Sequence, residues 1–280
     1  MSEHAQSPTG VLDRTLAVLE LLAQNAHGLH LFELADALDI PRSATHRILT
    51  ALVARGYVRQ ERNQGAYVLT ARIASLAFTF LAGSGVTDIA QPILDRLARE
   101  VGELVRLAVV DDSRLTWVAK AQGSSFGLRY DPDMGREARL SCSASGHAWL
   151  SSLSDEEALD LVQRQGFGSR EEYGPRAPQT PQALLKHLRL VRKRGYSITV
   201  QTFSAWMAAM AAPVRDPATG HVTGTVSIAG PHLRLTEERM HEMAPLLLAA
   251  AAELSLASVA SPALARRRGP NASIFADAAS

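Results

Sequence analysis

The sequence of 280 residues has a single cysteine, Cys142, so no disulfide can form within the chain. A metal site built from cysteines is excluded for the same reason. The histidines of the second half also lack the paired spacing of metal ligands. We therefore expect neither a metal site nor a cofactor.

The chain also lacks an excess of charge, because 29 lysines and arginines accompany 28 acidic residues and the formal net charge is +1. Total charge therefore does not argue for a nucleic-acid partner. The N-terminus has no basic segment followed by an apolar one. The longest apolar stretch, near residues 243–256, is too short and too rich in alanine to span a bilayer. We expect a soluble, cytoplasmic protein with no membrane partner.

Enzyme motifs are scarce: the chain has no G-x-S-x-G motif, no phosphate-binding glycine motif and no internal repeat. Ser141, Cys142, Ser143 and Ser145 lie close to His147, so a nucleophile with a histidine base is conceivable. Serines before a helix more often cap backbone groups. We expect no catalytic residues. The alternative is a small-molecule sensor or hydrolase-like enzyme that uses this loop, with its helix-turn-helix serving protein contacts.

Residues 31–70 carry the pattern of a winged helix-turn-helix. A first apolar stripe at helical spacing is broken by Asp39-Ile40-Pro41, because proline cannot continue a helix. A second stripe follows and stops at Gly56. Two strand-like pieces then flank a polar turn at residues 62–65. This order of elements makes DNA the first partner to test.

The distribution of charge supports that prediction, because six arginines and one acidic residue, Glu61, lie between Pro41 and Arg72. In a helix-turn-helix, the start of the second helix enters the major groove. We expect the start of that helix and the wing to contact DNA through Arg42, Ser43, Ala44, Thr45, His46, Arg47, Arg59, Arg62, Asn63 and Gln64.

The whole chain is predicted to be α+β, with a disordered N-terminus (1–10), a winged helix-turn-helix (11–70), a linker helix (71–85), an effector-binding domain (86–258) and a disordered tail (259–280). The domain after the linker should contain about six strands, mostly antiparallel, covered by helices. One of these strands is predicted at 128–130. Capping patterns place helix starts at Ser154 and Thr180, and Gly195 should end the second of these helices.

A ligand pocket is predicted in that domain. The hydroxyls and backbone N–H groups of residues 141–145, where a loop enters a helix, can hold a small carboxylate or hydroxyl. The apolar walls would come from Leu128, Leu140, Trp206 and Met207, each of which could equally be ordinary core.

Both halves of the chain together resemble IclR-type transcriptional regulators. The similarity covers about residues 11–256 and rests on segments such as GLHLFELADALDIPRSATHRILTALVARGYV, LSCSASGHAWLS and VSIAGPHLRLTEER. It implies a GAF-like α/β effector-binding domain behind the winged helix-turn-helix. It also implies a homodimer or dimer of dimers that binds a double-stranded operator, and a small organic effector, with aromatic acids as one class.

The resemblance also implies positions for the effector site, and this sequence departs from the family pattern at some of them. The implied site residues are the loop from Leu140 to Ser145 (Leu140, Ser141, Cys142, Ser143, Ala144 and Ser145) together with Thr199, Met207, Ala209, Ser227 and Ala229. Thr199 stands near a position that is often acidic, and Phe203 and Trp206 are additional aromatic residues. These changes suggest the hypothesis of a more apolar or aromatic effector.

Overall fold

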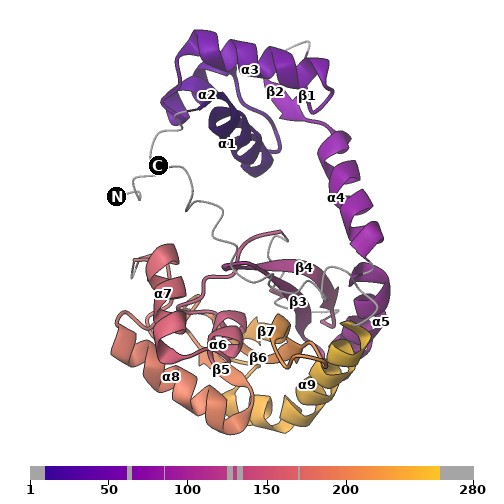
Figure 1. Cartoon of the computed structure of the whole chain (residues 1–280), viewed down its shortest axis with the longest axis vertical. Helices are drawn as coiled ribbons and strands as arrows, with labels where there is room; N and C mark the ends of the chain where they lie inside the picture. The colour runs from indigo at the N-terminus through magenta and orange to yellow at the C-terminus, as the bar shows by residue number, and fades with distance from the viewer. Residues whose placement is uncertain are drawn as a thin grey trace, which may run out of the picture. The chain divides into compact units, whose positions relative to one another are not determined.

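Figure 1 shows a computed structural model of the chain, which describes residues 10–61, 65–84, 86–124, 129–130, 135–169 and 171–258. The chain divides into two compact units between Gly83 and Ser84. The ends that the sequence predicts to be disordered lie outside the described residues, apart from Gly10. Within the described ranges, no helix is long and apolar enough to cross a membrane.

The N-terminal unit is a three-helix winged helix-turn-helix. Its elements are α1 (Val11–Gln24), α2 (Leu31–Ala37), α3 (Arg42–Ala54), β1 (Val58–Gln60) and β2 (Tyr67–Leu69). A capping box starts α2, in which the His30 backbone N–H donates to the Glu33 carboxylate at 2.6 Å. The turn between α2 and α3 passes through Asp39, whose φ of 51° reverses the chain. Pro41 then occupies the N-cap position of α3.

The core of this unit fixes α3 between α1 and the hairpin. Its buried side chains come from every element: Val18, Leu22, Leu34, Ile48, Leu49, Leu52, Val58 and Tyr67. The hairpin strands are antiparallel, and a bridge from Leu29 to Tyr67 ties the loop before α2 to the wing. Because the inner face of α3 is held on both sides, its outer face remains free for contacts.

The helix α4 (Ala71–Ser84) lies where the sequence predicts a linker helix. The Thr70 hydroxyl accepts a hydrogen bond from the Arg72 N–H at 3.2 Å at the start of this helix. Three large apolar side chains on α4 are 56–68% exposed: Leu76, Phe78 and Phe80. A helix that keeps such side chains in solvent is typical of a surface that a partner covers.

The C-terminal unit is built on an antiparallel five-stranded sheet in the order β4-β3-β7-β6-β5 (Figure 1). Its strands are β3 (Leu104–Asp111), β4 (Arg114–Gln122), β5 (Ser197–Val200), β6 (Met207–Arg215) and β7 (Val222–Pro231). Its helices are α5 (Val86–Val101), α6 (Ala144–Leu150), α7 (Asp155–Gln165), α8 (Pro181–Arg194) and α9 (Glu237–Ala257).

The prediction of a strand at 128–130 was wrong for its described residues, because Arg129 and Tyr130 belong to no strand. The strand β4 ends earlier, at Gln122, and the Gln122 side-chain amide donates to the Tyr130 carbonyl at 3.0 Å. The Tyr130 carbonyl therefore has a side-chain hydrogen-bond donor in place of a donor from a neighbouring strand. Leu128 lies outside the described residues.

Two apolar layers cover the sheet. The helices α5 and α9 pack on one face against alternate strand residues such as Leu107 and Val226. The helices α6, α7 and α8 pack on the other face, against residues such as Ala108 and Trp117. Because side chains alternate along a strand, Arg106 faces the α6 side, directly opposite Ser227 in the ladder. This face carries the cavity described below.

Candidate functional site

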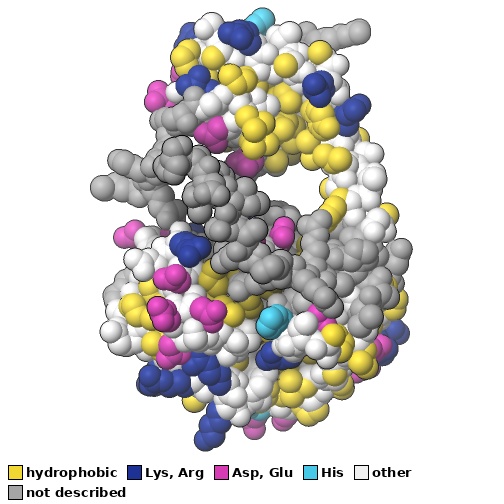
Figure 2. All heavy atoms as spheres, viewed as in Figure 1, with side chains coloured by type: hydrophobic (Ala, Val, Ile, Leu, Met, Phe, Trp, Pro, Cys, Tyr) yellow, Lys and Arg dark blue, Asp and Glu magenta, His cyan; other side chains and the backbone are white. Residues whose placement is uncertain are grey.

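The first half of α3 presents polar side chains to solvent. Arg42, Ser43, His46 and Arg47 are exposed, whereas Ile48 is buried in the core. Figure 2 shows basic side chains on the surface of the N-terminal unit where α3 lies. An exposed helix face of this composition suits entry into the major groove, where arginine pairs with guanine and phosphate.

Two of the predicted DNA contacts on this helix need correction. Thr45 is fully buried, and its hydroxyl donates to the Pro41 carbonyl at 3.2 Å. Ala44 is half-buried and packs against the core of the N-terminal unit. Thr45 starts the same helical stripe as Ile48 and Leu49, so it faces the core and cannot reach a base.

Replacing Thr45 with valine should therefore leave operator affinity within about twofold of wild type, because only a buried hydroxyl is lost. Removing one weak hydrogen bond of this kind costs about 1 kcal/mol of stability or less. Urea unfolding and titration of a labelled operator fragment measure the two effects. A loss of operator affinity above about tenfold in a folded T45V variant would restore Thr45 to the contact surface.

The predicted wing contacts are only partly described. Arg59 is exposed, and its guanidinium donates to the Glu61 carboxylate at 2.7 and 3.0 Å. An exposed ion pair of this kind contributes little and can be exchanged for a phosphate contact. The other predicted wing residues, Arg62, Asn63 and Gln64, lie outside the described residues.

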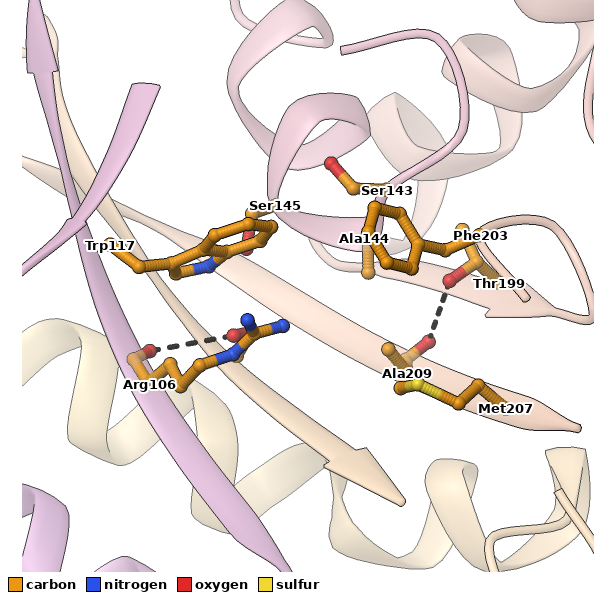
Figure 3. A pocket seen from close by; sticks show the side chains of 10 residues that line it. Arg106, Trp117, Ser143, Ala144, Ser145, Thr199, Phe203, Met207 and Ala209 are labelled. Atoms are coloured by element: carbon orange, nitrogen blue, oxygen red, sulfur yellow. Dashed lines mark hydrogen bonds between the residues drawn. The ribbon is translucent and has the colours of Figure 1, made fainter. Parts of the chain in front are cut away.

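A small cavity lies between the sheet of the C-terminal unit and the loop that starts α6 (Figure 3). Its free volume is about 20 Å³, room for about one water molecule, so a larger ligand requires the lining side chains to move. The residues that line it are Arg106, Trp117, Ser143, Ala144, Ser145, Thr199, Phe203, Met207, Ala209 and Ser227. They come from all five strands of the sheet, the start of α6 and the loop after β5, so the cavity exists only in the folded domain.

Seven of the predicted effector-site residues line this cavity: Ser143, Ala144, Ser145, Thr199, Met207, Ala209 and Ser227. Thr199 and Ala209 are opposed across β5 and β6, and the Thr199 hydroxyl donates to the Ala209 carbonyl at 3.3 Å (Figure 3). The Ser227 hydroxyl donates to the Arg106 carbonyl at 3.4 Å. The sheet register thus brings together residues that are distant in sequence.

The other described members of the predicted set do not line the cavity, and the prediction is corrected for them. Leu140, Cys142 and Ala229 are buried, and the Ser141 hydroxyl donates to the Phe167 carbonyl. Trp206 is 45% exposed and packs edge-on against Tyr130, because its position lies just before β6 begins.

Arg106 and Trp117 are cavity residues that the sequence did not identify. Arg106 is 5% exposed, and its guanidinium carbon lies 3.9 Å from the centroid of the Trp117 ring. Burial lowers the pKa of Arg106 to about 10, against a smaller opposing effect of Tyr130, so the side chain is still charged at neutral pH. Its Nε and Nη1 atoms are buried and make no hydrogen bond.

The polar side chains of the loop before α6 make structural hydrogen bonds, and no described nucleophile in this loop is paired with a base. The Ser143 hydroxyl accepts from the Gly146 N–H at 3.0 Å, as an N-cap does. The His147 Nε2 atom lies 2.8 Å from the Ser141 carbonyl, so this nitrogen carries the proton. Burial raises the pKa of the Cys142 thiol to about 12, which keeps it protonated and unreactive.

No metal site competes with this interpretation in the part of the chain that the structure describes. There, no group of three or more His, Cys, Asp or Glu side chains is placed to hold a metal ion. The exposed face of α3 and the cavity of the C-terminal unit are the two regions that match the sites predicted from the sequence.

Comparison with known proteins assigns both units to one family. The model of the IclR helix-turn-helix domain matches residues 11–62, and that of the bacterial transcriptional regulator IclR C-terminal domain matches residues 78–256. The Escherichia coli K12 transcriptional repressor IclR is 32% identical over 88% of this chain and 89% of its own length. The regulator BhcR of Paracoccus denitrificans is 30% identical over 87% and 85%.

A solved structure has the same fold. The IclR transcriptional regulator from Alicyclobacillus acidocaldarius superposes with a TM-score of 0.76 at 20% identity, covering 88% of this chain and 98% of the other. The matched residues include the exposed start of α3 and almost all of the domain that holds the cavity. The chain therefore belongs to the IclR family of DNA-binding bacterial transcriptional regulators.

Proposed function

We propose that this regulator binds its operator through α3 and that a small organic effector in the cavity of the C-terminal unit changes operator affinity. The observation that carries the proposal is the presence, in one chain, of an exposed arginine-bearing recognition helix and a separate cavity in the C-terminal unit. A DNA-binding site and a ligand site in different domains are what an effector-controlled regulator requires.

At the DNA, we assign the contacts to the exposed side chains Arg42, Ser43, His46 and Arg47. Arg42 lies 4.0 Å from the Asp36 carboxylate, and both side chains are 68% exposed. This weak pair leaves the guanidinium available for guanine or phosphate. Arg59 would add a phosphate contact from the wing.

At the cavity, the lining supports a small ligand with an apolar body. Phe203, Met207 and Ala209 provide apolar walls, and hydroxyls from Ser143 and Thr199 provide polar partners. An IclR homologue from Microbacterium hydrocarbonoxydans, 21% identical with a TM-score of 0.72, has been crystallised with 4-hydroxybenzoate. We take small aromatic acids as the first probes for that reason.

We also propose that the chain works as a homodimer, alone or as a dimer of dimers. Large apolar side chains are exposed on α4, and on α1 Val11, Leu12 and Leu16 are 49–74% exposed. Figure 2 shows hydrophobic side chains gathered over α1 on the visible face. A second copy of the chain would cover these faces and present two α3 helices to successive major grooves.

The proposal is tested by titrating a labelled DNA fragment from the gene's own promoter region with the full chain. We expect salt-dependent binding to a two-fold symmetric site, and an affinity that changes when 4-hydroxybenzoate or benzoate is added. Failure to prefer that fragment over unrelated DNA would contradict the operator assignment. Unchanged affinity with every small acid would contradict effector control.

A further inference from the structure

The cavity contains one buried positive charge whose counter-charge is not among the described residues. Arg106 lies on β3 with 5% exposure, and no described carboxylate forms an ion pair with it. Its contacts are with aromatic rings: its guanidinium carbon lies 3.9 Å from the Trp117 ring centroid and 5.5 Å from that of Tyr130. A buried charge normally needs a partner, because desolvation is costly.

The guanidinium has hydrogen-bonding capacity left for a ligand. Its Nε and Nη1 atoms are buried and without a hydrogen-bond partner. Figure 3 shows the guanidinium beneath the Trp117 ring, pointing toward the space bounded by Phe203 and Met207. Stacking on the indole holds the planar group in place. A carboxylate entering from the cavity would supply two acceptor oxygens to this fork.

The rest of the lining limits the ligand to a single negative charge. Arg106 is the one cationic side chain among the described residues that line the cavity. The opposite walls come from Phe203, Met207 and Ala209, where a second carboxylate would be desolvated without a cation.

We propose that Arg106 is the anion receptor of the cavity and that its ligand is a small monocarboxylate with an apolar body. The carboxylate contacts the guanidinium, and the body lies toward Phe203 and Met207. This inference rests on the proposed effector control, because it names the chemical class of the effector and the residue that selects it.

The test uses the full chain and calorimetric titration with benzoate, 4-hydroxybenzoate and phenylacetate. Each acid is compared with its own amide, and benzoate is also compared with terephthalate. We expect at least one monocarboxylate to bind and its amide to bind about 100-fold more weakly, as loss of a bidentate charge-assisted contact requires. Terephthalate should bind at least about tenfold more weakly than benzoate, because its second charge has no partner.

Variants at Arg106 provide the second comparison. R106M should weaken the bound monocarboxylate about 100-fold, and R106K should retain part of the affinity because lysine keeps the charge without the planar fork. The matched control is R114M, which removes an exposed arginine from the neighbouring strand β4 and should bind like wild type. If R106M does not fold, the comparison of acid with amide on the wild-type chain decides.

An amide that binds as tightly as its acid, an R106M variant with wild-type affinity, or no binding by any of the three acids would each overturn the inference. Effector control is judged separately, by the operator titration. A monocarboxylate that binds through Arg106 without changing operator affinity refutes effector control only. An amide that binds as well as its acid and releases the operator refutes the anion receptor only.

Discussion

Replacing Arg47 with alanine should weaken operator binding about 100-fold while leaving the fold intact. Arg47 is exposed on the outer face of α3, whereas its neighbour Ile48 is buried. Removal of the Arg47 guanidinium therefore leaves the core unchanged. Loss of one arginine contact with a base costs about 1–3 kcal/mol. A dimer loses the contact at both half-sites, and two losses of about 1.4 kcal/mol give a factor of about 100.

The matched control for this experiment is R55A. Arg55 is also exposed but lies at the C-terminal end of α3, away from the helix start. Its removal should change operator affinity less than about threefold, because an exposed charge contributes mainly a screened attraction. Anisotropy titrations of the operator at one salt concentration compare the variants. Equal losses in R47A and R55A would show that α3 supplies only undirected charge.

Acidification from pH 6.5 to 4 should destabilise the C-terminal unit by about 3 kcal/mol through His147 alone. This ring is fully buried, and burial, opposed by the hydrogen bond to Ser141 and assisted by the nearby His187 and Arg194, lowers its pKa to about 4. The folded chain therefore leaves His147 neutral in this range, whereas the unfolded chain binds a proton. Stability is full above pH 6.5 and falls as the pH approaches 4.

The measurement is urea unfolding at both pH values, followed by tryptophan fluorescence. H147Q cannot titrate, so its free energy of unfolding should fall by about 3 kcal/mol less than that of wild type. H187Q, which alters the half-buried neighbouring ring 5.4 Å away, should keep most of the wild-type dependence. Identical pH dependence in wild type and H147Q would show that His147 is protonated in the folded chain.

The His147 effect also concerns the cavity. The hydrogen bond from His147 to the Ser141 carbonyl holds the loop whose next residues, Ser143 to Ser145, line the cavity. Nδ1 of the same ring is buried without a partner, so protonation there places an unsatisfied charge beside this loop. We therefore expect ligand affinity to fall along with stability under acid conditions.

Much of the fold could be predicted because its signals are local. A capping box starts α7, where the Ser154 hydroxyl accepts from the Glu157 N–H at 3.2 Å. Thr180 caps α8, and Gly195 ends it with a φ of 84° that glycine adopts without strain. Each pattern spans a few residues, so the sequence alone contains the physical cause.

The buried state of Thr45 was also within reach of the sequence. Thr45, Ile48, Leu49 and Leu52 have the spacing i, i+3, i+4 and i+7, which places all four on one helix face. The prediction that Thr45 contacts DNA was wrong because it considered only the chemistry of the side chain and left out this spacing. The apolar spacing of α3, continued back from Ile48 to Thr45, places Thr45 in the core.

The role of Arg106 could not be predicted in the same way. An arginine in a strand normally faces solvent, and nothing near it in sequence indicates that helices cover both faces of the sheet. Its ladder partner Ser227 is 121 residues away, and the loop that closes the cavity comes from a third segment. Only the strand order and register bring these groups together.

The central claim is that occupation of the cavity and operator binding by α3 are coupled. Thermodynamic linkage requires that the operator change the ligand's affinity by the factor by which the ligand changes the operator's affinity, typically about 5–150. The direct test is the Kd of the tightest-binding monocarboxylate, measured for the free chain and for the chain saturated with operator DNA. We predict two Kd values that differ by that factor. Equal Kd values would contradict the account.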